Sequence, residues 1–277
     1  MVIAGASGFV GRRLIEALAP TCDAIALTRD ASGRPQTPGV AWRSCDLFSL
    51  RDAERALEGG DVGVYLVHSM MPSARLSQGS FDDMDLVCAD NFARAAATRG
   101  LGHIVYLGGL VPASDGEPLS RHLESRLEVE RTLAARDVPV TTLRAGLVVG
   151  AGGSSFQMMV RLVQRLPLMI APRWTRSKSQ AIGLGDVVTL LRFAVEHPEL
   201  SGRAYDVGCS DVVTYADLLR LTGDVLGKHT RILTVPMATP KLSLLWISLV
   251  AGAPRELVRP LVESLRHDMI ARDGLTL

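Results

Sequence analysis

The sequence predicts an α/β fold built on a doubly wound parallel sheet. Short, nearly all-apolar runs recur along residues 1–150, a helical pattern follows most of them, and the turns between them carry glycine or charged residues. Apolar runs without polar alternation are typical of parallel strands that helices cover on both faces. We therefore expect a sheet domain over residues 1–150 and a smaller α/β region over residues 151–277 that packs on it.

Strand and helix alternate regularly in the first half of the chain. Leu14, Ile15 and Leu18 recur at helical spacing after the first apolar run, and the next run returns as a strand. Gly100 and Gly102 separate a later helix from the strand that follows it. The expected strands are residues 1–4, 24–28, 40–45, 61–67, 103–108 and 138–144, and the expected helices are about 11–18, 49–57, 82–99 and 119–136.

The second half of the chain is less regular. A loop of glycine and serine at 150–155 leads to a helix that ends near residue 166, and a basic stretch follows at 172–178. No internal repeat or low-complexity linker is present, so this region is expected to pack on the first domain without a tether. The remaining expected elements are strands at 204–207 and 232–235, a helix at 215–226, and two helices separated near 253–254.

The composition is that of a folded protein without a polyanionic partner. The chain of 277 residues has 30 basic and 29 acidic residues, a formal net charge of +1, and 47% hydrophobic residues. The balanced charge disfavours nucleic acid binding, and the hydrophobic content disfavours disorder. The 4 cysteines lie far apart without a C-x-x-C pair, which fits reduced thiols and implies no metal site.

These features predict a cytoplasmic protein. The apolar N-terminus lacks the charged segment that begins a secretory signal. The longest apolar stretch, residues 242–253, is shorter than the about 20 residues that span a bilayer. We interpret it as a helix in the core or at a dimer contact rather than on a membrane surface, because it lacks a strongly basic polar face. Both a monomer and a homodimer remain open.

The N-terminal strand runs directly into three glycines spaced three residues apart. Glycines let the backbone turn tightly and approach a pyrophosphate, and the following helix points its positive N-terminal end at that anion. The order of strand, glycine turn, helix and strand fits a βαβ crossover of about 30 residues, which is the setting this motif requires. The motif therefore predicts a dinucleotide site formed by Gly5, Ala6, Ser7, Gly8, Phe9, Val10 and Gly11.

The end of the second strand bears on which dinucleotide binds. Arg29 follows this strand, and an arginine there pairs with the 2′-phosphate of NADP, whereas an acidic residue takes the ribose hydroxyls of NAD. Asp30 comes one residue later, so a shift of one residue in the strand end would favour NAD instead. We expect NADP, with NAD as the alternative and with Arg12 or Arg13 as helpers.

Further motifs occur together with the glycine loop and Arg29. They are Asp46-Leu47, Leu66-Val67-His68 with the next two residues, Tyr106-Leu-Gly-Gly-Leu110 and Leu143-Arg-Ala-Gly146. Together they resemble the atypical short-chain dehydrogenase/reductases, with NmrA-like and complex I accessory-subunit-like proteins as the nearest branches. The resemblance covers nearly the whole chain. It implies a Rossmann-like fold, a nicotinamide cofactor, a small-molecule substrate under the C-terminal region, and cofactor contacts at Asp46, Leu47, Leu66, Val67, His68, Gly108, Arg126 and Ala145.

The second half resembles a bacterial branch that is described only as NAD(P)H-binding oxidoreductases. The segments that carry this resemblance are 172–176, 182–187 and 259–266. Members of that branch often continue into another C-terminal domain. The sequence is therefore expected to be a short version of such a protein or a piece of a longer one.

The chain departs from the family at the catalytic residues. In active members the chemistry is done by a serine, a tyrosine, and a lysine four residues after the tyrosine, and the lysine lowers the pKa of the tyrosine. Here no lysine precedes Lys178, and none of the 4 tyrosines is followed by lysine at that spacing. His122 and Arg126 stand where the tyrosine and lysine are expected, and Gly108-Gly109 stands where the serine is expected.

Two interpretations of His122 and Arg126 are open. The two residues are one helical turn apart and share a face. In the first interpretation, His122 has an ordinary pKa of about 6.5 and exchanges a proton near neutral pH, while Arg126 holds the nicotinamide ribose or a substrate oxyanion. In the second, both lie on the exposed face of a charged helix, among solvated neighbours such as Glu124 and Glu128.

Three weaker candidates also have two interpretations each. His68 and Ser69 end the fourth strand, where ligands bind in open α/β sheets, or they are ordinary packed residues. Arg144 either faces the cofactor cleft or pairs with a carboxylate in the core. The basic residues of 172–178 either attract an anionic substrate or belong to a solvated loop.

The sequence favours an NADPH-dependent oxidoreductase that reduces a carbonyl, quinone or enone, with His122 as the proton donor. The alternative is a non-catalytic NADP(H)-binding redox sensor or assembly factor, which the missing tyrosine and lysine favour. A sugar-nucleotide epimerase on the same fold is the least favoured hypothesis, because it too normally needs that pair.

Overall fold

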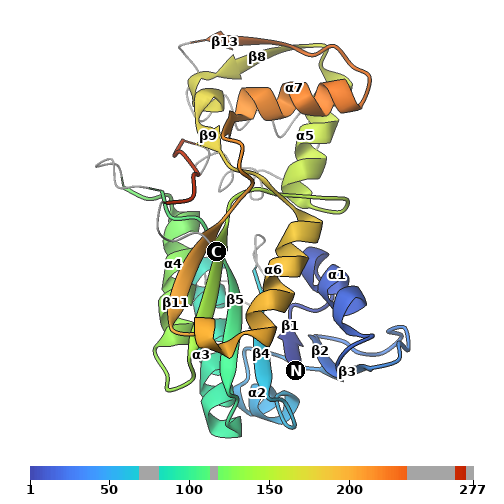
Figure 1. Cartoon of the computed structure of the whole chain (residues 1–277), viewed down its shortest axis with the longest axis vertical. Helices are drawn as coiled ribbons and strands as arrows, with labels where there is room; N and C mark the ends of the chain where they lie inside the picture. Colours follow the sequence, from blue (N-terminus) through green and yellow to red (C-terminus); the bar gives the residue numbers. More distant parts are fainter. Residues whose placement is uncertain (69–80, 113–117, 236–265, 273–277) are drawn as a thin grey trace.

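The structure is a computed structural model that describes residues 1–68, 81–112, 118–235 and 266–272. Within these residues, seven strands form one parallel sheet in the order β11-β6-β5-β4-β1-β2-β3 (Figure 1). The predicted doubly wound, Rossmann-like α/β fold is confirmed. The strands are β1 (Val2–Ala4), β2 (Ala24–Thr28), β3 (Val40–Ser44), β4 (Val62–Tyr65), β5 (His103–Gly109), β6 (Val140–Ala145) and β11 (Arg203–Val207).

Helices cover both faces of this sheet because alternate residues of each strand point to opposite sides. In β1, Ile3 packs into one apolar cluster and its neighbours Val2 and Ala4 pack into the other, and all three are fully buried. The first cluster contains residues of α1 (Phe9–Leu18) and α6 (Leu184–Glu196). The second contains residues of α2 (Leu50–Ala56), α3 (Phe81–Arg99) and α4 (Arg121–Ala134).

The seventh strand comes from the second half of the chain. β11 pairs with β6 in parallel from Arg203 to Val207, and α6 packs against α1. Residues 184–207 thus return to the sheet, although the expected division at residue 150 assigns them to the C-terminal region. The sequence predicts the strand at 204–207 but not its partner, because pairing across about 60 residues leaves no local pattern.

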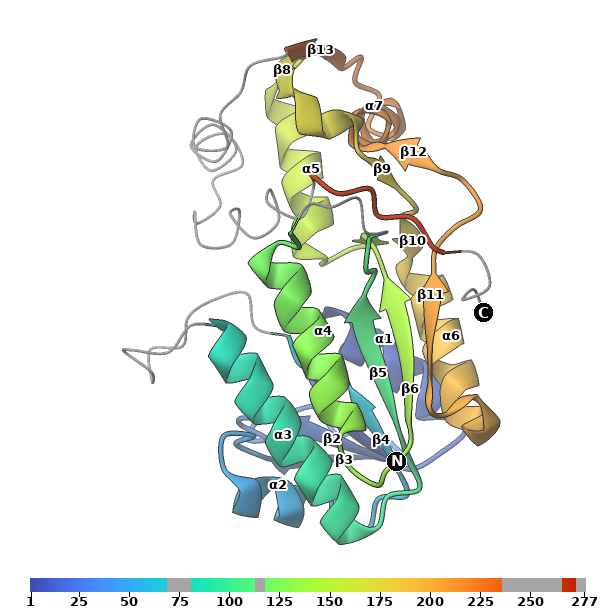
Figure 2. The same cartoon turned by 90° about the vertical axis from the view of Figure 1, so that its left-hand side faces the viewer.

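The remaining C-terminal elements lie beyond the carboxyl ends of β5 and β6 (Figure 2). The helices α5 and α7 contact each other, and short strand pairs flank them. These elements form a layer above the edge of the sheet at which ligands of this fold bind. They are β7 (Val148–Val149) with β10 (Ile182–Gly183), β8 (Leu168–Pro172) with β13 (Arg231–Val235), β9 (Lys178–Ser179) with β12 (Val213–Thr214), α5 (Ser154–Arg165), α7 (Tyr215–Val225), and a 3-10 turn at Arg173–Arg176. A second 3-10 turn, Pro198–Leu200, connects α6 to β11.

Most element bounds differ from the predicted ones by one to three residues. The first helix begins at Phe9 rather than near Gly11, because Gly8 is extended and serves as its N-cap. The helix expected at 119–136 begins after Ser120, whose hydroxyl accepts a hydrogen bond from the Leu123 N–H. The apolar stretch 242–253 and the helices expected around 253–254 lie outside the described residues. In the part of the chain that is described, no helix has the length and apolar character needed to cross a membrane.

Candidate functional site

The glycine loop forms a tight backbone cradle between β1 and α1. Gly5 has a φ of 82°, a left-handed conformation that favours glycine, and its carbonyl accepts a hydrogen bond from Gly8 N at 2.9 Å. A Cβ on Gly11 would lie 2.3 Å from the Gly5 oxygen. The first N–H groups of α1 have no side-chain cap, and its first turn holds no acidic residue. The cradle therefore fits the pyrophosphate of a dinucleotide.

A cavity of about 550 Å³ extends from this loop to the C-terminal layer. Its inner part is formed by the glycine loop and by the carboxyl ends of β4, β5 and β6. Its outer part is mainly apolar and is formed by α5, α7 and Met269. The lining residues are Gly5, Gly8–Gly11, Leu66, His68, Leu107–Gly109, His122, Leu123, Arg126, Ala145–Val148, Gly153–Ser155, Met158, Met159, Leu162, Tyr215, Leu219 and Met269.

The cavity brings together many of the residues that the sequence singles out. Those that line it are Gly5, Gly8, Phe9, Val10, Gly11, Leu66, His68, Gly108, His122, Arg126 and Ala145. The others, Ala6, Ser7, Arg29, Asp46, Leu47 and Val67, lie in the loop or at the ends of strands β2, β3 and β4 without lining the cavity. Leu47 and Val67 pack against the core instead, and Ser69 lies outside the described residues.

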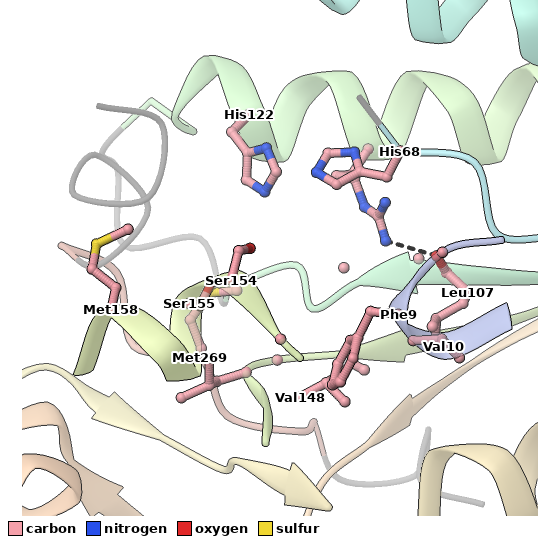
Figure 3. A pocket seen from close by; sticks show the side chains of 18 of the residues that line it. Phe9, Val10, His68, Leu107, His122, Val148, Ser154, Ser155, Met158 and Met269 are labelled. Atoms are coloured by element: carbon pink, nitrogen blue, oxygen red, sulfur yellow. Dashed lines mark hydrogen bonds between the residues drawn. The ribbon is translucent and has the colours of Figure 1, made fainter. Parts of the chain in front are cut away.

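His68, His122 and Arg126 gather on one side of the cavity. His68 follows β4, whereas His122 and Arg126 lie one turn apart on α4. The two imidazole rings have centroids 5.0 Å apart and are tilted by 53°. Figure 3 shows these rings next to each other, with Ser154 and Met269 on the opposite side of the cavity. The strand end and the helix thus present two imidazoles and one guanidinium to the same space.

Among the described residues, His68 has a hydrogen-bond partner on only one of its ring nitrogens. Its Nδ1 lies 3.2 Å from Oδ2 of Asp85, a buried carboxylate of α3. Its Nε2 is buried and has no hydrogen-bond partner among the described residues. Burial, with the charge of Arg126 as the smaller cause, holds the pKa of His68 well below 6.5. The free protein therefore carries a neutral His68 at pH 7.

His122 is also neutral in the free protein. Burial is the main cause that lowers its pKa to about 3, and His68 and Arg126 add to the effect. The expectation of an ordinary pKa near 6.5 is wrong, because the cavity wall removes water from the ring. The interpretation of His122 and Arg126 as an exposed helix face is wrong as well, because both residues line the cavity.

Arg126 is held in place by its neighbours. Its Nη2 donates a hydrogen bond to the Leu107 carbonyl at 2.7 Å, the contact drawn as a dashed line to Leu107 in Figure 3. Its guanidinium carbon lies 5.6 Å from the centroid of the Tyr106 ring. The Tyr106 hydroxyl donates to the Arg126 carbonyl at 3.3 Å, and a Cβ on Gly109 would lie 3.6 Å from Arg126 Nε. A fixed positive charge therefore lies beside the two imidazoles.

The end of β2 carries two exposed arginines. Arg29 is exposed, as expected for a residue that contacts a ligand at the open edge of the sheet. Arg34 folds back so that its Nη2 donates to the Thr28 hydroxyl at 3.0 Å and its guanidinium lies 5.2 Å from the Trp42 ring centroid. Asp30 accepts hydrogen bonds from the N–H and the hydroxyl of Ser32. These hydrogen bonds, the hydroxyl first, lower the pKa of Asp30.

The other basic candidates lie away from the cavity lining. Arg13 pairs with Glu16, and Arg12 Nε donates to the Gly8 carbonyl at 3.4 Å. Arg144 pairs with Glu130 through Nε at 2.8 Å and lies 3.8 Å from the buried Asp206, so pairing with carboxylates is confirmed. Within the basic stretch 172–178, Arg176 and Lys178 are exposed, and the Arg173 side chain lies outside what the structure describes.

Sequence reasoning missed the outer part of the cavity. Met158 and Leu162 lie on α5, Tyr215 and Leu219 lie on α7, and Met269 comes from a segment near the end of the chain. A helical apolar pattern predicts that one face of each helix is covered, but not that the covered face encloses a cavity. Asp85 was missed as well, because one acidic residue on a helix face carries no local signal.

A glycine cradle below a cavity at the carboxyl edge of a parallel sheet defines a dinucleotide-binding protein. Residues 5–162, more than half of the chain, match the family described as NAD(P)H-binding. The chain therefore belongs to this NAD(P)H-binding family.

Similar proteins include enzymes that act with nicotinamide cofactors. The chain is 29% identical to the auxiliary protein GraX of Staphylococcus aureus over 39% of its length, and the match spans only 36% of GraX. A nucleoside-diphosphate-sugar epimerase from S. aureus has the same fold, with a TM-score of 0.78, 14% identity, and coverage of 99% of this chain and 92% of that one. The NADPH-dependent quinone oxidoreductase QOR2 of Escherichia coli, solved with NADPH, has a TM-score of 0.71 and 19% identity over 97% of this chain and 88% of its own.

Proposed function

We propose that this protein reduces an uncharged, apolar carbonyl, quinone or enone with NADPH. The observation that carries the proposal is the continuous cavity, which begins at a dinucleotide cradle and ends in a chamber of apolar side chains. Among the described residues that line it, only Arg126 has a permanently charged side chain. A reductase of an apolar substrate needs these parts next to each other: a cofactor cradle, a charged group near the reacting oxygen, and an apolar chamber.

Residues 5–11 would hold the pyrophosphate of the cofactor, and the ends of the neighbouring strands would hold its remainder. Leu66, Gly108 and Ala145 are available from the cavity wall, and Asp46 is available at the end of β3. When bound, the reduced nicotinamide supplies a hydride to the substrate.

NADP is the form of the cofactor that we propose, because positive charge gathers at the end of β2. Arg29 is exposed there, and the guanidinium of Arg34 is folded back onto Thr28 in the same turn. Guanidinium groups bind a phosphate through charge-assisted hydrogen bonds. Asp30, the residue that would otherwise bind the ribose hydroxyls of NAD, accepts its hydrogen bonds from Ser32.

The apolar chamber argues against a sugar nucleotide as substrate. A nucleotide diphosphate-sugar brings two negative charges and many hydroxyl groups, each of which needs a partner when it leaves water. Met158, Met159, Leu162, Leu219 and Met269 offer no such partners. A flat, apolar quinone or enone can fill this chamber without leaving polar groups unpaired.

A non-catalytic NADP(H)-binding sensor or assembly factor is the second candidate. The observation that favours it is the substitution of the tyrosine and lysine pair by His122 and Arg126, together with Gly108-Gly109 at the serine position. A cytoplasmic location, a monomeric or homodimeric state, and the division of the chain near residue 150 stay predictions.

The test is NADPH oxidation by the purified chain with a panel of apolar quinones, enones and carbonyls, together with an assay for UDP-glucose epimerisation. We expect steady NADPH oxidation with apolar acceptors and no epimerisation. NADPH binding without turnover of any acceptor would support the sensor, and epimerisation would contradict our interpretation of the chamber.

A further inference from the structure

The pair formed by Asp85 and His68 leaves one ring nitrogen of His68 without a hydrogen-bond partner among the described residues. A carboxylate only accepts hydrogen bonds, so the 3.2 Å contact with Asp85 places the proton of the neutral ring on Nδ1 and the lone pair on Nε2. This Nε2 is buried and unpartnered among the described residues, and His68 lines the cavity. A buried polar atom without a hydrogen-bond partner destabilises the fold. A ligand group that donates a hydrogen bond to this nitrogen would remove that destabilisation.

We propose that His68, oriented by Asp85, is the catalytic residue that exchanges a proton with the substrate oxygen. His122 and Arg126 bind that oxygen from α4. This proposal rests on the proposed reductase function. It assigns the proton transfer of that reaction to His68 and Asp85, whereas the sequence predicts His122 as the proton donor. An aspartate and histidine pair on two elements would thus replace the tyrosine and lysine on one helix.

The other acid and base candidates around the cavity are less suitable. Tyr65 and Tyr106 lie in the core below the sheet edge, and burial raises the pKa of each phenol. Tyr215 lines the outer chamber, and burial raises its pKa to about 12. His122 has no hydrogen-bond partner among the described residues, so nothing orients its ring as Asp85 orients His68.

The step balances in both directions. In reduction, a hydride that the reduced nicotinamide would supply adds to the carbonyl carbon, the C=O π electron pair moves to oxygen, and that oxygen takes the proton from Nε2 of the His68 imidazolium. The ring would return to the neutral form, with its remaining proton on Nδ1 and still donated to Asp85. In oxidation, the Nε2 lone pair takes the hydroxyl proton while hydride returns to NADP⁺. The proton consumed in reduction is replaced from water.

The pH dependence follows from the groups that face His68. These are Asp85 on α3 and His122 and Arg126 on α4, and Arg126 opposes a positive charge on the ring. Reduction needs the cationic ring, which is scarce above its lowered pKa. We therefore expect kcat/KM for reduction to fall about tenfold per pH unit between about pH 6.5 and 8.5, and for oxidation to stay nearly constant.

The first experiment measures the protonation state and the tautomer of the His68 ring in the absence of cofactor and substrate. Nitrogen-15 histidine NMR of the full chain at pH 7, with His68→Asn to assign the signal, reports protonation and tautomer. We expect a neutral His68 with its proton on Nδ1. A neutral ring protonated on Nε2, or a charged ring at pH 7, would overturn the proposal whether or not the protein turns over a substrate.

The second experiment uses His68→Asn, whose amide N–H still reaches toward Asp85 but which has no atom at the Nε2 position. We expect kcat for quinone or enone reduction to fall by about 100-fold or more, the pH slope to disappear, and the dissociation constant of NADPH to change by less than about threefold. His229→Asn, at an exposed position, is the matched control. Unfolding curves report whether each variant is folded, and Asp85→Asn, which turns the acceptor into an amide, should lower kcat at least about tenfold.

The outcomes separate the two proposals. If the wild-type chain oxidises NADPH and His68→Asn keeps both the rate and the pH slope, the role of His68 is wrong and the reductase function stands. If His68→Asn instead weakens NADPH binding at unchanged kcat, the nitrogen accepts a cofactor hydroxyl, and the catalytic role is again wrong. If none of the acceptors in the panel supports NADPH oxidation by the wild-type chain, the reductase function is wrong, and the catalytic role of His68 is wrong with it.

Discussion

The inner and outer parts of the cavity are built in different ways. The inner part is mainly backbone from one continuous segment, residues 5–11, completed by the ends of three neighbouring strands. The outer part consists of side chains from α5, α7 and Met269, which are far apart in the sequence. A site made of close backbone contacts tolerates almost no added atom, whereas an apolar chamber accepts volume-conserving exchanges. Cofactor binding and substrate choice should therefore respond to different substitutions.

Among these substitutions, Gly11→Ala should have the largest effect, and we expect it to act on the affinity for NADPH. The added Cβ would lie 2.3 Å from the Gly5 oxygen and 2.8 Å from Ala6 Cα, so the loop must move. We expect the dissociation constant of NADPH to rise by about 100-fold or more, because the pyrophosphate contacts depend on that backbone. Calorimetric titration measures this change.

Gly185→Ala is the matched control for that substitution. Gly185 lies in the first turn of α6, and a Cβ there would meet no atom within 4 Å. We expect unchanged NADPH binding and equal or slightly higher stability, because alanine is the better helix former. If both variants bind NADPH like the wild-type chain, the loop does not hold the pyrophosphate.

Arg29→Ala should weaken NADPH binding by about 10- to 100-fold and leave NADH binding nearly unchanged, because a charge-assisted phosphate contact is lost. The two dissociation constants are measured side by side. Arg192→Ala serves as control, since Arg192 is exposed on α6, pairs with Glu196 and does not line the cavity. If the binding of NADPH and of NADH weakens equally, Arg29 does not contact the 2′-phosphate.

Leu219→Gln should raise the KM for an apolar quinone by about tenfold or more with an unchanged dissociation constant for NADPH. The substitution places an amide in the outer chamber, where Leu219 is only 8% exposed. Leu221→Gln is the control, because Leu221 lies on the same helix and is 52% exposed. Steady-state kinetics with both variants give the comparison. Weaker NADPH binding in Leu219→Gln would contradict the separation of the two parts.

A last prediction concerns the stability of the chain at acid pH, not ligand binding. The pKa of His122 is about 3 in the folded chain and about 6.5 when unfolded, so its stabilising contribution is complete above pH 6.5 and is lost as pH falls toward 3. The loss approaches about 1.4 kcal/mol per pH unit between these values. Urea unfolding from pH 7 to 4.5 gives the slope of the unfolding free energy against pH, which should be shallower for His122→Asn than for the wild-type chain. His229→Asn, at an exposed position, is the control variant. Equal slopes in all three proteins would mean that His122 titrates in the same way in both states.

The same contrast explains what the sequence predicts and what it does not. Gly5, Gly8 and Gly11 lie close together in the sequence, and their spacing after a strand predicts both the strand-turn-helix unit and the cofactor cradle. The contact between His68 and Asp85, and the ion pair between Arg144 and Glu130, join different elements and leave no periodic signal. His122 is an intermediate case, because its helical spacing from Arg126 is visible in the sequence, but its burial and its contact with the His68 ring, which lower its pKa, are not.

Calorimetric titration of the wild-type chain with NADPH and NADH tests the central claim most directly. We expect NADPH to bind at one site with a dissociation constant at least about tenfold lower than that of NADH, because the arginines at the end of β2 bind its phosphate. Binding of neither cofactor would contradict the account, and tighter binding of NADH would contradict the role of Arg29.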